Sequence, residues 1–88
     1  MATVRLRPPL RERAGGETEH ELPGTTVGEV LRALETRYDR IEGWILDEHA
    51  RVRPHVCVFL NGERVREGAA VGAHDRLVIL PSISGGDG

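Results

Sequence analysis

The stretch from Thr26 to Tyr38, TVGEVLRALETRY, decides the fold. Its apolar side chains recur at helical spacing and its charged side chains take the other side, which is the pattern of an amphipathic helix. The hydroxyl of Thr26 can accept a hydrogen bond from a free amide of the first turn, and Glu29 three residues later fits a capping box. This stretch therefore predicts one main helix whose apolar stripe needs a sheet to pack against. The apolar positions are Val27, Val30, Leu31, Leu34 and Tyr38.

Two strands are predicted before this helix. Residues 2 to 7 have the two-residue alternation of a half-buried strand, which Pro8-Pro9 ends. Residues 10 to 16 form a longish loop that closes on a glycine pair. Residues 17 to 22 then return as a polar strand, which suits an edge of the sheet because charged side chains discourage unwanted pairing.

A hairpin and a last strand are predicted after the helix. Residues 55 to 60 form an apolar strand and residues 63 to 66 return beside it. Between them, Asn61-Gly62 is the dipeptide preferred in a two-residue turn that requires positive φ at both positions. Residues 76 to 80 form the last strand, and Pro81 ends it.

The connector between the helix and this hairpin, residues 39 to 53, is less regular. Its apolar side chains can form a short helical turn that closes one end of the core. We expect Trp44 to be part of that core, because the single tryptophan of a small domain usually buries a large apolar area. The alternative is that Trp44 is a surface anchor for a partner.

This order of elements predicts an α+β domain of the β-grasp (ubiquitin-like) fold. A mixed sheet of four to five strands packs on one main helix, and the final strand returns to pair beside the first. We expect the β-grasp domain to span residues 1 to 81. Three of the last four residues are glycine, so residues 82 to 88 are expected to form a flexible C-terminal tail.

Composition excludes several classes of protein. A formal net charge of -2 argues against a basic nucleic-acid binder. No apolar run is long enough to span a bilayer and the N-terminus lacks the apolar core of a signal peptide, so we expect a cytoplasmic protein without membrane contact. All 12 cationic residues are arginine, so no lysine of this chain can carry an isopeptide bond.

No catalytic or metal-binding constellation stands out, and we expect neither an enzyme nor a bound cofactor or metal. The four histidines are scattered at spacings without metal-ligand logic and are expected to be structural or at the surface. Cys57 lies inside an apolar strand and is expected to be a packed thiol. The glycine pair of the first loop lacks the lysine of a phosphate-binding loop.

The two apolar strands cannot hide both faces under a single helix. An exposed apolar group rimmed by arginines is typical of a docking surface. The alternative is that the connector folds over this second face and covers it. The helix-facing set is Val4, Leu6, Val56, Val58, Leu60, Leu77 and Ile79, and the opposite set is Phe59, Val78, Leu80 and Cys57, beside Arg5 and Arg7.

The tail around Gly85 and Gly86 can supply chemistry of its own. A glycine carboxylate has no side chain to hinder attack, and a Gly-Gly strip is thin enough to enter the narrow channel of another enzyme. An ATP-using partner could convert this carboxylate to an acyl-adenylate, and sulfide or a persulfide could then displace AMP. Composition alone favours a simpler interpretation, a frayed end.

The sequence resembles the ThiS/MoaD family of ubiquitin-like sulfur carriers, particularly the longer CysO-like type that serves cysteine synthesis. The resemblance covers nearly the whole chain, and its most specific part is the last segment, where a proline, a hydrophobic residue and Gly-Gly stand in the order and spacing of the family. It favours a positioned reactive tail over a frayed end. The segments that carry it are Arg7–Arg11 with Gly15-Gly16, Thr26–Leu31, Ile45–Glu48, Val56–Glu63 and Ile79–Gly86.

The resemblance implies that Gly86 is adenylated by an ATP-dependent adenylyltransferase and converted to a thiocarboxylate, with Gly85 giving access. The chain would then be a protein cosubstrate that delivers sulfur to an acceptor enzyme, such as a cysteine synthase or an enzyme of another thio-metabolite or natural product. The residues expected to contact these partners are Phe59, Val78, Leu80, Pro81, Ile83, Arg5 and Arg7.

The chain departs from the family after Gly86, because it continues with Asp87-Gly88. Our hypothesis is that a peptidase, plausibly a JAMM-type metalloprotease, removes this extension. Activation at Gly88 itself fits poorly, since the side chain of Asp87 would lie next to the reacting carbon. Two other functions stay open: the small, MoaD-like subunit of molybdopterin synthase, and a non-catalytic interaction module with an inert tail.

Overall fold

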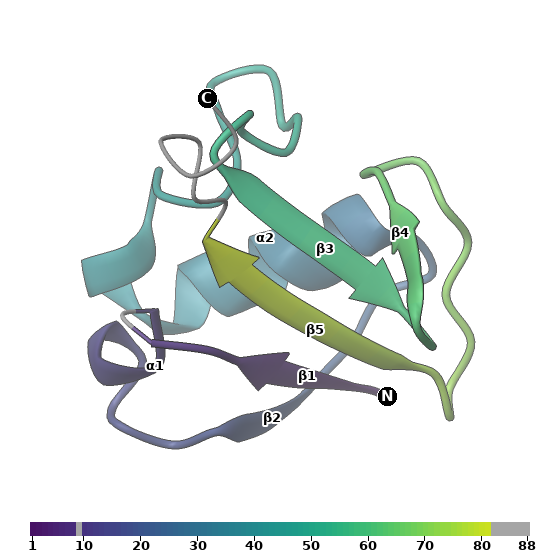
Figure 1. Cartoon of the computed structure of the whole chain (residues 1–88), viewed down its shortest axis with the longest axis horizontal. Coiled ribbons are helices and arrows are strands. Elements are labelled where there is room, and N and C mark those ends of the chain that lie inside the picture. Colours follow the sequence, from purple (N-terminus) through teal and green to yellow (C-terminus); the bar gives the residue numbers. More distant parts are fainter. Residues whose placement is uncertain (9, 82–88) are drawn as a thin grey trace.

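The computed structural model describes residues 1–8 and 10–81 (Figure 1). Within them, five strands, two α-helices and one 3-10 helix follow one another along the chain. The elements are β1 (Ala2–Leu6), α1 (Leu10–Arg13), β2 (Glu19–Leu22), α2 (Val27–Arg37), η1 (Asp39–Ile41), β3 (Val56–Leu60), β4 (Glu63–Val65) and β5 (Arg76–Pro81).

The five strands form one mixed sheet in the order β2-β1-β5-β3-β4. β1 and β5 pair in parallel, and the other neighbours are antiparallel. α2 runs across one side of this sheet, behind the strands in Figure 1. The predicted β-grasp fold is confirmed, including the return of the last strand to a place beside the first.

The start of α2 shows how the predicted helix cap is built. The Thr26 hydroxyl accepts a hydrogen bond from the Glu29 amide at 3.2 Å, as predicted. The Glu29 carboxylate, however, accepts from the amide of Thr25 at 2.7 Å rather than from Thr26, so the capping box is wider by one residue. This hydrogen bond from the Thr25 backbone is the main reason that the pKa of Glu29 lies below its usual range.

The predicted Asn61-Gly62 turn is confirmed, because φ is 51° at Asn61 and 92° at Gly62. The Asn61 side chain then ties the turn to the start of β5. Its amide donates to Asp75 at 3.0 Å, and its carbonyl oxygen accepts from the Arg76 amide at 3.0 Å. The Asn61 side chain therefore reinforces the register in which β3 pairs with β5.

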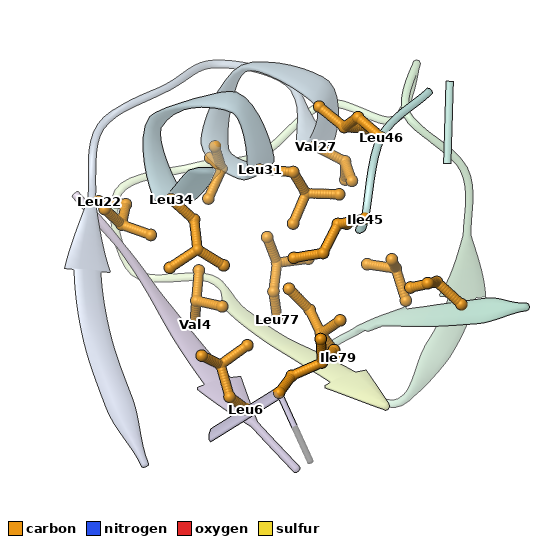
Figure 2. Packing of buried hydrophobic residues seen from close by; sticks show 14 of the residues in the cluster. Val4, Leu6, Leu22, Val27, Leu31, Leu34, Ile45, Leu46, Leu77 and Ile79 are labelled. Atoms are coloured by element: carbon orange, nitrogen blue, oxygen red, sulfur yellow. The ribbon is translucent and has the colours of Figure 1, made fainter. Parts of the chain in front are cut away.

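The core lies between the sheet and α2 (Figure 2). Val4, Leu77 and Ile79 enter it from the sheet, and Leu31 and Leu34 meet them from the helix, all five fully buried. Burying one such side chain contributes about 1.5–3 kcal/mol. The predicted helix-facing set is confirmed, with Leu60 only partly buried against the core at its edge.

The predicted loop at residues 10 to 16 is wrong in its first part, which is the helical turn α1. Leu10 and Ala14 are four residues apart, so a helical turn places both on one face, and both are buried. The strand that follows begins at Glu19 rather than at Glu17. The ring of the buried His20 bonds the carbonyl oxygen of Glu17 at 3.0 Å and so holds that residue in a turn before the strand.

The prediction for Trp44 is wrong, because 43% of this residue is exposed. Ile41 and Ile45 are four residues apart on the same side of the connector and fill the end of the core, both fully buried. Trp44 therefore points outward, where the Arg13 guanidinium lies 3.9 Å from its ring centroid. This cation–π contact joins the connector to α1.

Candidate functional site: the open face of the sheet

The strand register places the predicted docking residues in rows across the side of the sheet away from α2. Arg5 pairs with Val78, Val78 with Phe59, and Phe59 with Arg64. Cys57 pairs with Leu80 in the neighbouring row. We call this side the open face; it comprises Thr3, Arg5, Cys57, Phe59, Asn61, Arg64, Arg76, Val78 and Leu80, with Glu19 and Glu21 on the edge strand β2.

The connector does not cover the open face. Ile41, Ile45 and Leu46 are buried in the same core as α2, and Figure 2 shows Ile45 and Leu46 on the helix side of the sheet. Phe59 and Val78 consequently stay half-buried rather than buried. The predicted apolar face is therefore present, and the alternative in which the connector hides it is wrong. Whether a partner uses this face stays a prediction.

The open face is richer in positive charge than the rest of the molecule. Arg5, Arg64 and Arg76 lie on it, and all three are exposed. Arg5 approaches Glu19 at 3.8 Å, with more than half of each side chain exposed, so this ion pair is loose and well screened by water. The remaining two arginines have no ion-pair partner among the described residues.

A hollow of about 280 Å³ lies at one end of the open face. It is found where β5 begins, on the far side of the sheet from the core. Charged residues of three strands, β1, β2 and β5, line it together with the two residues of the hairpin turn. The lining residues are Thr3, Arg5, Glu19, Asn61, Gly62, Arg76, Leu77 and Val78.

The tail leaves the sheet from the other end of β5. Pro81, the last described residue, pairs with Val56, and the Arg7 amide donates to the Ile79 carbonyl oxygen at 3.0 Å. Both neighbours of the central strand thus hold its last residues in place. The other predicted positions, namely Ile83, Gly85, Gly86, Asp87 and Gly88, lie outside the described residues.

Two carboxylates that the sequence did not single out hold the connector in place. Glu35 of α2 accepts hydrogen bonds from the amides of Ile45 and Leu46 at 3.0 and 2.9 Å. Glu67 accepts from the Val52 amide at 2.8 Å, and this bond is the main cause that lowers the pKa of Glu67. These contacts span 10 to 15 residues, so no local pattern could have revealed them.

The connector also contains a self-contained loop. Asp47 accepts hydrogen bonds from the amides of His49 and Arg51, and the Arg51 bond contributes most to the lowered pKa of Asp47. Such a loop fixes the chain direction without a hydrophobic core of its own. The connector is therefore held by hydrogen bonds within itself as well as by those to Glu35 and Glu67.

The histidines match their predicted structural and surface roles. His20 is buried, and its Nε2 donates to the Glu17 carbonyl oxygen, which can only accept. Its Nδ1 is then free to accept from the Tyr38 hydroxyl at 3.1 Å. His49, His55 and His74 are exposed. Across residues 1–8 and 10–81, no three histidine, cysteine or acidic side chains cluster as metal ligands would, and no helix is both long and apolar enough to cross a membrane.

A mixed five-stranded sheet packed on one helix, with an open face and a central strand that ends at Pro81, defines a ubiquitin-like β-grasp protein. The chain belongs to the ThiS family, whose sequence model matches residues 4–86.

Similar proteins come from archaea and bacteria. Small archaeal modifier protein 3 of Haloferax volcanii is 37% identical over 65 residues, covering 69% of this chain and 70% of the relative. Small archaeal modifier protein 1 of the same organism is 34% identical over 79 residues, covering 88% and 91%. In the crystal structure of the Amycolatopsis orientalis BexX/CysO complex, the matched chain superimposes with a TM-score of 0.85 at 31% identity, covering 94% of this chain and 97% of that one.

These matches confirm the resemblance stated from the sequence. They place the chain in a family of ubiquitin-like sulfur carriers and modifiers.

Proposed function

We propose that this chain is a sulfur carrier whose reactive group is the carboxylate of Gly86. The observation that carries the proposal is the family match, which runs from residue 4 through Gly86 and leaves Asp87 and Gly88 beyond it. The geometry is compatible with this role, because β5 is central in the sheet and its end is held by strands on both sides. A tail that starts from so fixed a position can be presented to a partner in a defined direction.

The chemistry requires two steps, both at the carboxyl group of Gly86: the first at its oxygen and the second at its carbon. In the first step, the carboxylate oxygen attacks the α-phosphorus of ATP, pyrophosphate leaves, and an acyl-adenylate forms. In the second step, a sulfide or persulfide sulfur attacks the carbonyl carbon and AMP leaves with the bonding electron pair; a persulfide donor also needs a thiol to reduce the resulting disulfide. The product is a thiocarboxylate, whose sulfur an acceptor enzyme can use for cysteine or another thio-metabolite.

Neither step is possible while the Gly86 carbonyl is part of a peptide bond to Asp87. We therefore include hydrolysis of that bond in the proposal, with a JAMM-type metalloprotease as the class of enzyme that would perform it. The 88-residue chain would then be a precursor, and the carrier would be the form that ends at Gly86.

The open face is the proposed docking surface for the activating enzyme. Its apolar centre, Phe59, Val78 and Leu80, is half-buried and lies on β5, which leads to the tail, and on the neighbouring strand β3. The matched chain in the BexX/CysO complex belongs to an assembly of two proteins, which supports a function in partnership.

The test is a sulfur-loading assay with the chain cut back to Gly86. Each adenylating enzyme of the source genome is mixed with this chain, ATP and sulfide, and the intact mass is measured. We expect a mass increase equal to the difference between sulfur and oxygen, and no increase for the 88-residue chain. A control that ends at Gly85 should load much more slowly. Failure with every adenylating enzyme would contradict the proposal and favour an interaction module with an inert tail.

A second candidate function is attachment to other proteins, which the names of the two archaeal relatives favour. The acyl-adenylate would be shared, but a lysine amine of a target would replace sulfide as the nucleophile. Arg76 is the last tryptic site of the chain, so a modified target lysine would carry residues 77–86 after trypsin digestion. Detection of that branched peptide in cells would establish modification, whereas a thiocarboxylate alone would favour sulfur carriage.

A further inference from the structure

The hollow at the start of β5 has the charge and shape of a site for an acidic side chain. Arg5 and Arg76 both line it, from neighbouring parallel strands, and Val78 supplies an apolar wall. Glu19 also lines it, 3.8 Å from Arg5, so the two arginines exceed the one carboxylate and the net charge of the lining is +1. The guanidinium groups offer planar arrays of N–H donors that match the two oxygens of a carboxylate.

The hollow is also preorganised, because its backbone is held in place before any ligand binds. The backbone of Arg76 is held by Asn61 from both directions, since the Arg76 amide donates to the Asn61 side chain and the Asn61 amide donates to the Arg76 carbonyl oxygen at 2.9 Å. The start of β5 therefore does not need to be ordered when a ligand binds, which lowers the entropic cost of binding.

The charge of the open face is opposite to that of the whole molecule. The open face and the adjoining Arg7 contain four arginines (Arg5, Arg7, Arg64 and Arg76) and two glutamates (Glu19 and Glu21), a balance of +2. The whole chain is -2, so the rest of the molecule is -4. A partner gains from acidic groups that face the open face. Acidic groups of the partner that face the rest of this molecule are repelled by its negative charge.

We propose that the hollow between Arg5 and Arg76 binds a carboxylate side chain on an acidic, apolar-flanked segment of the protein that docks on the open face. The apolar flanks contact Val78 and Phe59, which are neighbours across β5 and β3. This inference rests on the proposed function only in that the docking protein is the activating enzyme.

The position of the hollow fixes its distance from the start of the tail. It lies where β5 begins at Arg76, and the tail leaves where β5 ends at Pro81. Five strand steps separate the two points, or about 17 Å. A carboxylate held in the hollow therefore lies about 17 Å from Pro81, where the tail begins. A partner anchored there would fix its own orientation relative to the start of the tail before chemistry starts.

The experiment is an NMR titration of the ¹⁵N-labelled full chain with a capped tetrapeptide, acetyl-Leu-Asp-Leu-Glu-amide. We expect amide shifts gathered at Thr3, Arg5, Gly62, Arg76 and Val78, which weaken as salt is raised. The neutral twin, acetyl-Leu-Asn-Leu-Gln-amide, should bind at least about tenfold more weakly, because the charged partner of the arginines is gone. Equal binding of the twin, or shifts concentrated on α2, would overturn the proposal.

Four variants sharpen the test. Arg76→Glu should weaken acidic-peptide binding at least about tenfold, and Arg76→Gln, which removes the charge without reversing it, should weaken it less but clearly. Arg32→Glu makes the same charge change on α2 and should leave binding within about twofold, since the site is on the other side of the sheet. If Asp87→Asn moves the hollow amides without any peptide, the occupant is the chain's own tail and the partner proposal is wrong.

This titration is independent of sulfur loading, because it needs neither ATP nor an enzyme. A chain that binds the acidic peptide but never loads sulfur would refute the proposed function and keep the acidic site. A chain that loads sulfur at an unchanged rate with Arg76→Glu, and does not bind the peptide, would refute the site and keep the function.

Discussion

The two sides of the sheet are made by the same strands, but they differ in how deeply their side chains are buried and in what they contact. On the helix side, Val58, Leu77 and Ile79 are completely buried under α2 and the connector. On the open face, their sequence neighbours Phe59 and Val78 stay half-buried, among arginines. One residue of shift along a strand separates a position that stabilises the fold from one that is available to a partner.

The largest expected difference between the two sides of the sheet comes from substitutions at adjacent residues of β5. Ile79→Ala should lower the free energy of unfolding by about 2–5 kcal/mol, because it leaves a cavity in the core. Leu80→Ala, one residue away, should cost under about 1.5 kcal/mol, because the side chain already contacts solvent. Urea denaturation of both variants checks this. Equal losses would mean that the open face is core.

The connector belongs to the stable side, and Glu35 tests that. Glu35→Ala leaves the amides of Ile45 and Leu46 without their acceptor, and we expect a loss of about 1–3 kcal/mol. Glu35→Gln keeps an oxygen acceptor and should lose clearly less. Hydrogen exchange at the two amides gives the local readout, and unchanged protection in Glu35→Ala would contradict the contact.

A charge placed on the open face should separate docking from folding. Phe59→Arg or Leu80→Arg should reduce the kcat/KM of sulfur loading by about tenfold or more, because an apolar contact at the centre of an interface is lost. The thermal unfolding midpoint should change little. Unfolding of either variant would instead assign that side chain to the core, and unchanged loading would remove it from the docking surface.

Acid should weaken the connector, the helix cap and the hairpin before it weakens the apolar core. Backbone N–H donors lower the pKa of Glu29, Asp47, Glu67 and Asp75 in the folded chain. Their stabilisation is therefore complete above the unfolded values of about 4 and is lost as pH falls through the lower folded values. Thermal midpoints measured from pH 6 downward should begin to fall near pH ~4. Asp75→Asn should make this decline shallower, and an identical decline would exclude Asp75 as a contributor.

The smallest expected effect is at Trp44, a large apolar side chain of the connector that is exposed rather than packed in the core. Arg13→Gln removes the charge above the ring and should cost about 0.5–1 kcal/mol. Since Trp44 is the single tryptophan, its fluorescence reports the change directly. An unchanged emission spectrum would mean that the stacked contact is not populated in solution.

Most of the fold could be predicted because its signals are local. The spacing of apolar residues in α2, the cap at Thr26 and the Asn61-Gly62 turn each act within a few residues, and all three are present. The open face was also predictable, since one helix cannot cover two apolar faces. The predicted reactive glycines and their extension lie outside the described residues and stay predictions of the sequence and its family.

The predictions that were wrong concern one choice between neighbouring residues and one very short helix. Ile45 or Trp44 could have closed the core, and only the packed geometry selects Ile45. The turn α1 is too short for its periodicity to stand out, although Leu10 and Ala14 show the spacing in retrospect.

By itself, the sequence determined the main helix and the strands, the β-grasp order, the apolar second face and the Gly-Gly motif, because these depend on local spacing and residue type. Only the tertiary structure decided what distant segments do to each other: that Glu35 and Glu67 hold the connector, that Trp44 faces outward onto Arg13, and that Arg5 and Arg76 line one hollow. The physical reason is that a hydrogen-bond acceptor or a guanidinium can serve many partners, and the packing of the whole chain selects one.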